Sequence, residues 1–265
     1  MKKLMFAAAL AGAMTGLCDV SSANVVGYAN VNKGEGEQYS MIGNIFQDIG
    51  GGETLDLNDL KGDYQYGDQL QLVKMVDSEE IFDFDIYNYY DADNLWESWL
   101  DEPGWADVDG YAPEGVGLDL GRGCYLITAS GDGEDSRFSG QVKGLAHTHV
   151  FDDQYTIMGS AFPLTFDLND ARCDWAMPYA AQIQVVKMVD NDEIFDFDIY
   201  NYYDADNLWE SWLDEPGWAD VDGYAPEGPV VNAGNAFYLI FPDDATPGEW
   251  GMVETSPIGA ADAAE

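Results

Sequence analysis

A long stretch of this chain occurs twice. Glu80–Gly115 recurs without a change as Glu193–Gly228, 113 positions further along. A period this long indicates a duplicated domain rather than a solenoid of short repeats. We therefore predict four parts: a leader at residues 1–23, copy one at 24–139, copy two at 140–250 and an acidic flexible tail at 251–265.

Most of each copy is predicted to be β-structure. In copy one, short segments rich in Val, Ile, Tyr and Phe alternate with Gly and Asp, which is the pattern of strands and turns. These segments are Val25–Asn32, Tyr39–Phe46, Gln69–Val76, Phe82–Tyr90, Cys124–Ala129 and, at the junction of the copies, Phe138–Gly144. They favour an all-β fold of two tandem sandwich or jelly-roll-like domains. Only Leu57–Leu60 and Leu95–Leu100 suggest short helices.

Two local contacts are predicted in the repeat. If residues 77–80 form a hairpin loop, Lys74 lies opposite Asp83, and such an opposite-charge pair contributes about 0.2–1 kcal/mol. Lys187 and Asp196 repeat this pair. Further on, Asn94 and Glu97 have the spacing of a capping box, so we expect a helix that places Trp96, Trp99 and Leu100 on one face. The alternative is a strand or an ordered loop.

The leader has the features of a secretory signal peptide. Lys2 and Lys3 precede the apolar run Leu4–Leu17, and small residues at Ser21 and Ala23 offer a cleavage site after Ala23. The alternative is an uncleaved membrane anchor, for which the run is short. We therefore expect an exported protein, extracellular, at the cell surface or periplasmic, with no membrane insertion after cleavage.

The charge is strongly negative. The chain has 10 Lys and Arg against 50 Asp and Glu. Nucleic acid is excluded as a partner because phosphate binding needs a basic surface, and anionic membranes are disfavoured for the same reason. Cations are the natural counter-species. The hydrophobic content of 46% indicates a folded chain.

Two cysteines, Cys124 and Cys173, remain after removal of the leader. An oxidising compartment permits a disulfide between them, and the loop that it closes would stabilise the fold by about 4 kcal/mol. The alternative is a pair of buried free thiols.

Calcium is the one candidate cofactor. Oxygen ligands suit this ion, and D-x-D pairs recur in both copies. The candidate ligands are Asp91, Asp93, Asp107 and Asp109, with Asp204, Asp206, Asp220 and Asp222 in copy two. The EF-hand pattern fails, because Leu95 occupies the fifth position of such a loop. The alternative is that these residues form turns and caps.

Glycan binding is the second hypothesis. Aromatic rings interleaved with carboxylates suit a sugar, whose C–H faces stack on rings and whose hydroxyls donate to acids. The candidate residues are Trp96, Trp99, Trp105 and Tyr111, with Trp209, Trp212, Trp218 and Tyr224 in copy two. The alternative is that the tryptophans belong to the core or to packing between domains.

Short motifs at both ends of the mature chain resemble a family of uncharacterised exported tandem β-domain proteins of environmental bacteria. The motifs are Asn24-Val25-Val26-Gly27-Tyr28, Tyr39-Ser40-Met41-Ile42-Gly43-Asn44 and Gly234-Asn235-Ala236-Phe237-Tyr238-Leu239. The resemblance covers most of the mature chain. It implies export and a repeated β-domain, and it supplies no activity or site residues.

These observations together predict a non-catalytic binding protein. The chain has none of the usual hydrolase, metalloprotease, P-loop or dinucleotide-binding motifs. We expect a bivalent binder of a polysaccharide or cell-surface glycan, or of divalent cations. The alternatives are a structural envelope or matrix protein and a secreted glycoside-active enzyme.

Overall fold

The protein is all-β, as predicted. The computed structural model describes residues 26–32, 35–47, 52, 54–60, 64–75, 82–132, 135–143, 146–151, 154–165, 167–188, 195–228, 230–243, 245 and 248–255. Within these residues it contains seventeen strands and three short 3₁₀ turns, and no α-helix. The predicted leader lies outside the described residues.

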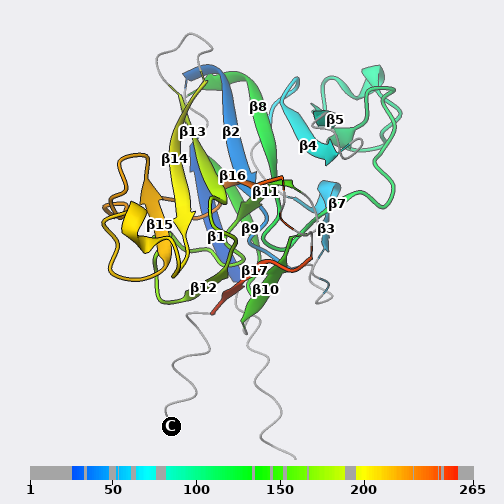
Figure 1. Cartoon of the computed structure of the whole chain (residues 1–265). Coiled ribbons are helices and arrows are strands. Elements are labelled where there is room, and N and C mark those ends of the chain that lie inside the picture. Colours follow the sequence, from blue (N-terminus) through cyan, green and yellow to red (C-terminus); the bar gives the residue numbers. More distant parts are fainter. Residues whose placement is uncertain are drawn as a thin grey trace, which may run out of the picture.

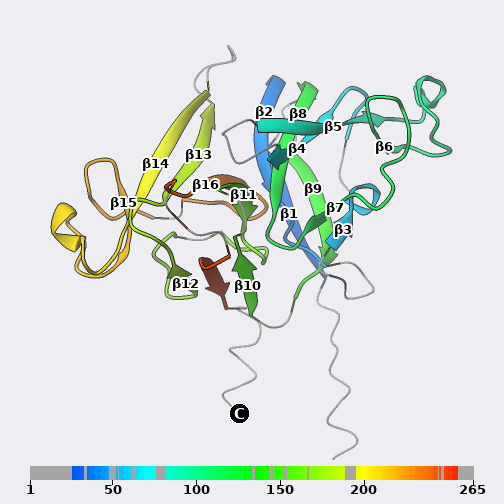
Figure 2. The same ribbon diagram turned by 45° about the vertical axis from the view of Figure 1, so that its right-hand side comes forward.

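Two five-stranded antiparallel sheets carry most of the strands and have equivalent strand orders (Figure 1). The first has the order β2 (Glu35–Gly43), β8 (Gly123–Asp132), β4 (Gln69–Met75), β5 (Phe82–Tyr90) and β6 (Gly104–Ala106). The second has the order β11 (Tyr155–Gly159), β16 (Ala236–Ile240), β13 (Gln182–Met188), β14 (Phe195–Tyr203) and β15 (Gly217–Asp220). Figure 2 shows the two sheets beside each other.

Three smaller sheets complete the fold. They pair β1 (Val26–Asn32) with β9 (Asp135–Gln141), β3 (Thr54–Asp56) with β7 (Gly117–Asp119), and β17 (Gly251–Glu254) with both β10 (His147–Val150) and β12 (Cys173–Ala176). Two of these strands lie at predicted boundaries. β9 crosses the boundary placed at residues 139 and 140, and β17 occupies the start of the predicted tail because its Met252 is buried in a core.

Each five-stranded sheet buries one face in a hydrophobic core of its own. Successive strand residues point to opposite faces, so Leu70 and Leu126 enter the first core while Ile183 and Leu239 enter the second. All four are 0% exposed. Burying one such side chain contributes about 1.5–3 kcal/mol, which explains why the Val- and Ile-rich runs form strands here.

The opposite faces of the two sheets meet each other. Met41, Ile157 and Ala236 are buried between them, and the hydroxyl groups of Tyr125 and Tyr238 are hydrogen-bonded to each other. Burial raises the pKa of both tyrosines, so the pair stays neutral at physiological pH. Because these tyrosines occupy equivalent places in the repeat, the contact relates the two sheets by an approximate two-fold axis.

Backbone hydrogen bonds join the sheets at the same junction. The Gly43 N–H donates to Gly234 O at 2.9 Å, and the Gly159 N–H donates to Gly121 O at 3.0 Å. A Cβ atom on Gly43 would lie 3.2 Å from the Cα atom of Gly159, and one on Gly159 would lie 2.7 Å from Asn235 O. A side chain at Gly159 would clash with Asn235 O, and one at either glycine would press on the backbone across the junction, so glycine suits both positions.

The predicted register of the repeated hairpin is confirmed. Lys74 lies opposite Asp83, and Lys187 lies opposite Asp196. The loop at residues 77–80 lies outside the described residues. The register follows from the alternation of β5, which places Tyr87 in the core and Phe84 against Tyr125 at the junction.

The predicted helix at Leu95–Leu100 is wrong. The helical part is limited to one 3₁₀ turn at Leu95–Glu97, and its repeat has one at Leu208–Glu210. The Asn94 side chain makes no capping hydrogen bond. Asp91 holds the turn instead, because its Oδ1 accepts hydrogen bonds from two of the following backbone N–H groups. The loop alternative describes this segment better.

The predicted disulfide is also wrong. Cys124 and Cys173 are free and buried, the first in the core of one sheet and the second in the core of the other. Separate packing keeps the two thiols apart. Burial raises the pKa of both thiols and holds them in the protonated form, which is the less reactive one.

Gly159→Ala should lower the free energy of unfolding by about 1–3 kcal/mol, because the added methyl group forces the two backbones apart. Urea denaturation followed by tryptophan fluorescence measures this change. Thr148→Ala, on the exposed side of β10, is the control and should stay within about 0.5 kcal/mol of the wild type. Equal stability of Gly159→Ala and the control would contradict the tight junction.

The two buried thiols should not react with a thiol reagent in the folded protein. In a chain that begins at residue 24, both should react after unfolding in guanidinium without reductant, because burial rather than oxidation protects them. Spectroscopic counting of released thiolate decides this. Failure of either thiol to appear after unfolding would show that a disulfide forms.

Candidate functional site

The repeated segment carries a pair of parallel aromatic rings at the surface of each copy. Trp99 lies parallel to Tyr111 with ring centroids 5.9 Å apart, and Trp212 lies parallel to Tyr224 with centroids 5.8 Å apart. Trp99 and Trp212 are each 73% exposed. We call each of these two pairs an aromatic platform. Such a platform offers an apolar face that is open to a ligand.

Backbone hydrogen bonds hold each platform in place. The Trp212 N–H donates to Gly223 O at 2.9 Å, and the Tyr224 N–H donates to Asp220 Oδ1 at 2.9 Å. Gly223 has a φ of +86°, which glycine adopts without the steric cost that a side chain brings. The same bonds occur in copy one among Trp99, Gly110, Tyr111 and Asp107. The platforms are therefore ordered before any ligand arrives.

The other tryptophans of the repeat divide between surface and core. Trp96 and Trp209 are 79% exposed. Trp105 and Trp218 are 1% and 0% exposed, so the prediction that these two contact a ligand is wrong. They lie in β6 and β15 at the edges of the sheets, where their bulk fills the cores. Within the described residues neither indole N–H has an acceptor, a cost of about 1–3 kcal/mol each.

The predicted calcium ligands do not come together. No three His, Cys, Asp or Glu side chains among the described residues form a group suited to a metal ion. Instead, the first Asp of each D-x-D pair accepts a hydrogen bond from the backbone N–H of the second. This holds for Asp91 with Asp93, Asp107 with Asp109, Asp204 with Asp206 and Asp220 with Asp222. These residues shape the loops, as the turn alternative proposes.

An open cleft of about 540 Å³ lies beside the platform of copy two. Trp212 belongs to both the platform and the cleft. The other aromatic residues that line the cleft are Trp175 of β12 and Tyr202 of β14. Asn169 lines one side of the cleft and is held by the backbone of Trp218. Its side chain accepts a hydrogen bond from the backbone N–H of Trp218 and donates one to the backbone O of Trp218, both at 2.8 Å.

Four carboxylates line the same cleft. Asp170 is paired with Arg172 through bonds of 3.0 Å and 2.5 Å, and these bonds lower the pKa of Asp170. Asp174, Asp214 and Glu215 are exposed and form no hydrogen bond or ion pair with the described side chains. The cleft thus combines aromatic walls with three carboxylates that no basic residue of the described part balances.

Copy one has an equivalent for most of these residues. The equivalent pairs, with the copy-one residue first, are Asn58 and Asn169, Asp59 and Asp170, Tyr64 and Trp175, Tyr89 and Tyr202, Trp99 and Trp212, Asp101 and Asp214, and Glu102 and Glu215. Residues 61–63, which would complete the comparison, lie outside the described part. The main difference is Tyr64 in place of Trp175, so the two copies share the platform but differ in the wall behind it.

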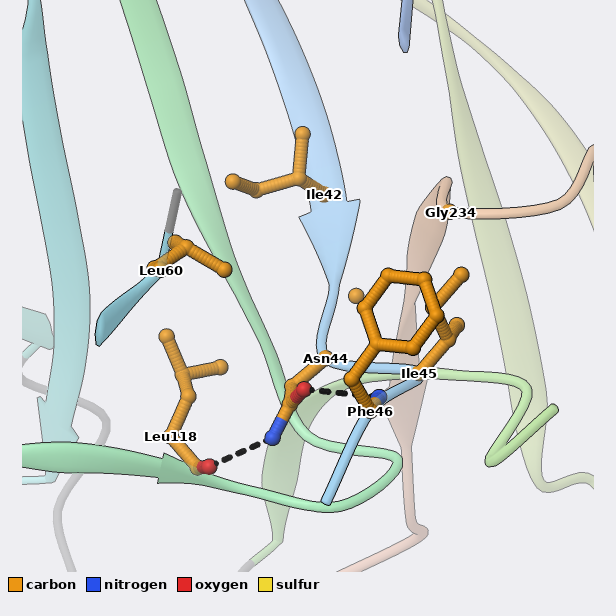
Figure 3. A pocket seen from close by; sticks show the side chains of 8 residues that line it. Ile42, Asn44, Ile45, Phe46, Leu60, Leu118 and Gly234 are labelled. Atoms are coloured by element: carbon orange, nitrogen blue, oxygen red, sulfur yellow. Dashed lines mark hydrogen bonds between the residues drawn. The ribbon is translucent and has the colours of Figure 1, made fainter. Parts of the chain in front are cut away.

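A second cavity is too small to hold a ligand. It has a volume of about 10 Å³, which is close to the space that one water molecule needs. Figure 3 shows Asn44 beside it: Asn44 Nδ2 donates to Leu118 O at 2.7 Å, and the Phe46 N–H donates to Asn44 Oδ1 at 3.0 Å. The bonds satisfy this buried amide and support the chain as it leaves β2.

A buried polar cluster surrounds Glu254 of β17, and its hydrogen bonds serve the fold. Glu254 accepts hydrogen bonds from the Ser160 hydroxyl and from the Ala161 N–H, the second at 2.8 Å. His149 Nε2 lies 3.4 Å from the same carboxylate. All three side chains, Ser160, His149 and Glu254, are buried. Because Ser160 bonds to the carboxylate rather than to the histidine, the cluster does not have the arrangement of a Ser-His-acid triad.

Comparisons with protein-family models, with curated proteins and with solved structures give no match. The resemblance to exported bacterial β-proteins therefore stays a prediction. Within the described part of the chain, no helix has the length and apolar character needed to cross a membrane.

Sequence reasoning missed the cleft because its two sides come from distant parts of copy two. Asp214 and Glu215 lie two and three positions after Trp212 in the repeat, whereas Asp174 and Trp175 lie in a strand outside the identical stretch. The matching Asn58-Asp59 and Asn169-Asp170 pairs were a usable signal, since Asn169 forms one side of the cleft.

Asp220→Ala should disturb the platform, because the Tyr224 and Asp222 N–H groups lose their common acceptor. We expect a loss of about 1–3 kcal/mol in stability and a weaker near-ultraviolet circular dichroism signal from the aromatic pair. Asp220→Asn keeps the oxygen acceptor and should retain most of both. Asp222→Ala is the control for loss of a charge. If Asp220→Ala matches that control, the bracing role is refuted.

Proposed function

We propose that this chain is a non-catalytic, bivalent glycan-binding protein with one aromatic platform in each copy. The observation that carries the proposal is the pair of platforms, Trp99 with Tyr111 and Trp212 with Tyr224. A sugar ring stacks its C–H face on such rings, while its hydroxyls donate to nearby carboxylates. Asp214 and Glu215 stand next to the platform of copy two and suit this second role.

The rigidity of the platforms supports the proposal. Ordering a mobile loop during binding costs free energy and weakens the complex. Here the backbone N–H groups of Trp212 and Tyr224 donate to Gly223 O and Asp220 Oδ1, and these bonds fix both residues beforehand. The free energy of the weak stacking contacts then contributes to affinity, because it does not have to offset the cost of ordering the loop.

The net charge and the predicted export indicate which class of glycan to expect as the ligand. The formal net charge of −40 disfavours acidic polysaccharides, so the expected ligand is a neutral or cationic glycan. The proposal includes export by the predicted leader to a compartment where cell-surface and free polysaccharides occur.

Two linked sites strengthen binding to a polymer. Once one platform is bound, the second meets its ligand at a high effective concentration, and overall affinity can rise by about 10²–10⁴-fold if both sites reach the same chain. The junction between the two sheets fixes how the platforms are placed relative to each other, so the gain depends on the length of the glycan.

Trp99→Ala and Trp212→Ala test the proposal singly and together. With a short oligosaccharide, each single variant should halve the number of sites seen by calorimetry, and the double variant should show none. With the polymer, each single variant should weaken binding by about 10²-fold through lost avidity. Val221→Ala, an exposed apolar change in the same loop, is the control. Binding of no glycan in an array of neutral and cationic polymers would overturn the proposal in favour of a structural role.

A further inference from the structure

We infer that the cleft beside the copy-two platform selects a glycan that carries free amino groups, such as an oligomer of glucosamine. This inference rests on the proposed glycan-binding function and names the ligand class for one of the two sites. It is carried by the cleft as a whole: its size, its aromatic walls and the charge that lines it.

The size of the cleft fits a sugar unit rather than an ion. A volume of about 540 Å³ lies within the range of small-molecule sites. The carboxylates of Asp174, Asp214 and Glu215 come from two separate segments around it, and no described group of acidic side chains converges as a metal site would require. Charges spread around an open cleft suit an organic cation, whose charged group occupies one part of a larger body.

The aromatic walls favour the same ligand. Trp175 and Trp212 line the cleft together with the three carboxylates. An ammonium group is attracted to the face of an aromatic ring, most strongly to that of tryptophan, and it donates hydrogen bonds to carboxylates. An amino sugar satisfies both kinds of group, because its ring has a C–H face for stacking and its amine carries the charge.

Arg172, which pairs with the cleft residue Asp170, does not compete for the other three carboxylates. Arg172 donates to both oxygens of Asp170, so its charge is already matched. Asp174, Asp214 and Glu215 are left unbalanced on a chain whose net charge is −40. A bound amine lowers the mutual repulsion of these groups, whereas a neutral sugar of the same shape does not.

The experiment compares three oligomers of equal length that differ at one carbon: glucosamine, N-acetylglucosamine and glucose units with the same linkage. Binding is measured by calorimetry on the full chain with Trp99→Ala, so that only copy two reports. We expect the glucosamine oligomer to bind about fivefold or more tightly than the other two, as two exposed ion pairs would provide. Added salt should reduce this preference, because it screens exposed charges.

The variant Asp214→Asn with Glu215→Gln removes two charges at constant shape and should abolish the preference, because it weakens binding of the glucosamine oligomer more than binding of the glucose oligomer. Glu227→Gln with Glu249→Gln removes the same charge from exposed positions outside the cleft and serves as the matched control. Equal binding of the three oligomers by the parent chain, or a preference that survives in the cleft variant, would overturn this inference and leave the proposed function standing. Failure of all three oligomers and of every polymer to bind would overturn both.

Discussion

The direct backbone contact at Gly43 and Gly159 is the constraint on which the rest of the structure depends. Each glycine donates a hydrogen bond to the opposite half of the molecule, and an added Cβ atom would lie 3.2 Å from a backbone atom at Gly43 and 2.7 Å from one at Gly159. The contact lets Tyr125 and Tyr238 meet and closes the apolar layer between the sheets. Two sheets that would otherwise expose an apolar face to water therefore form one unit, and the platforms that extend from β5 and β14 have a fixed relation to each other.

This arrangement explains the composition of the repeated strands. β5 must serve two apolar environments, because Tyr87 enters the core of its own sheet and Phe84 contacts Tyr125 at the junction. Asp83 and Asp85 share a face with Tyr87 but are exposed, so the core covers only part of the strand. The alternation thus separates a face that packs at the junction through Phe84 from a face that is buried at Tyr87 and solvated at Asp83 and Asp85.

Period-two patterning was enough to predict the all-β fold and the register of Lys74 with Asp83, because both depend on local alternation. The segment after β5 was harder. The spacing of Trp96, Trp99 and Leu100 fits a helix, but the turn ends after Glu97, because Ser98 is extended and the Trp99 N–H donates to Gly110 O. Burial of Trp105 and separation of Cys124 from Cys173 depend on which sheet covers which face. The cleft depends on contacts between β12 and the repeat, which no local pattern encodes.

The acidic residues of the repeat fall into two physical classes, and the distinction changes how the composition is interpreted. Asp107 and Asp220 have oxygen atoms that accept hydrogen bonds from backbone N–H groups, so their role is to position the rings. Asp214 and Glu215 have no such bonds and face an open cleft. A count of carboxylates favours a calcium site, because it treats both classes as free ligands. Once the committed ones are set aside, the remaining charge lies next to aromatic faces, and that combination suits an organic cation better than a metal ion.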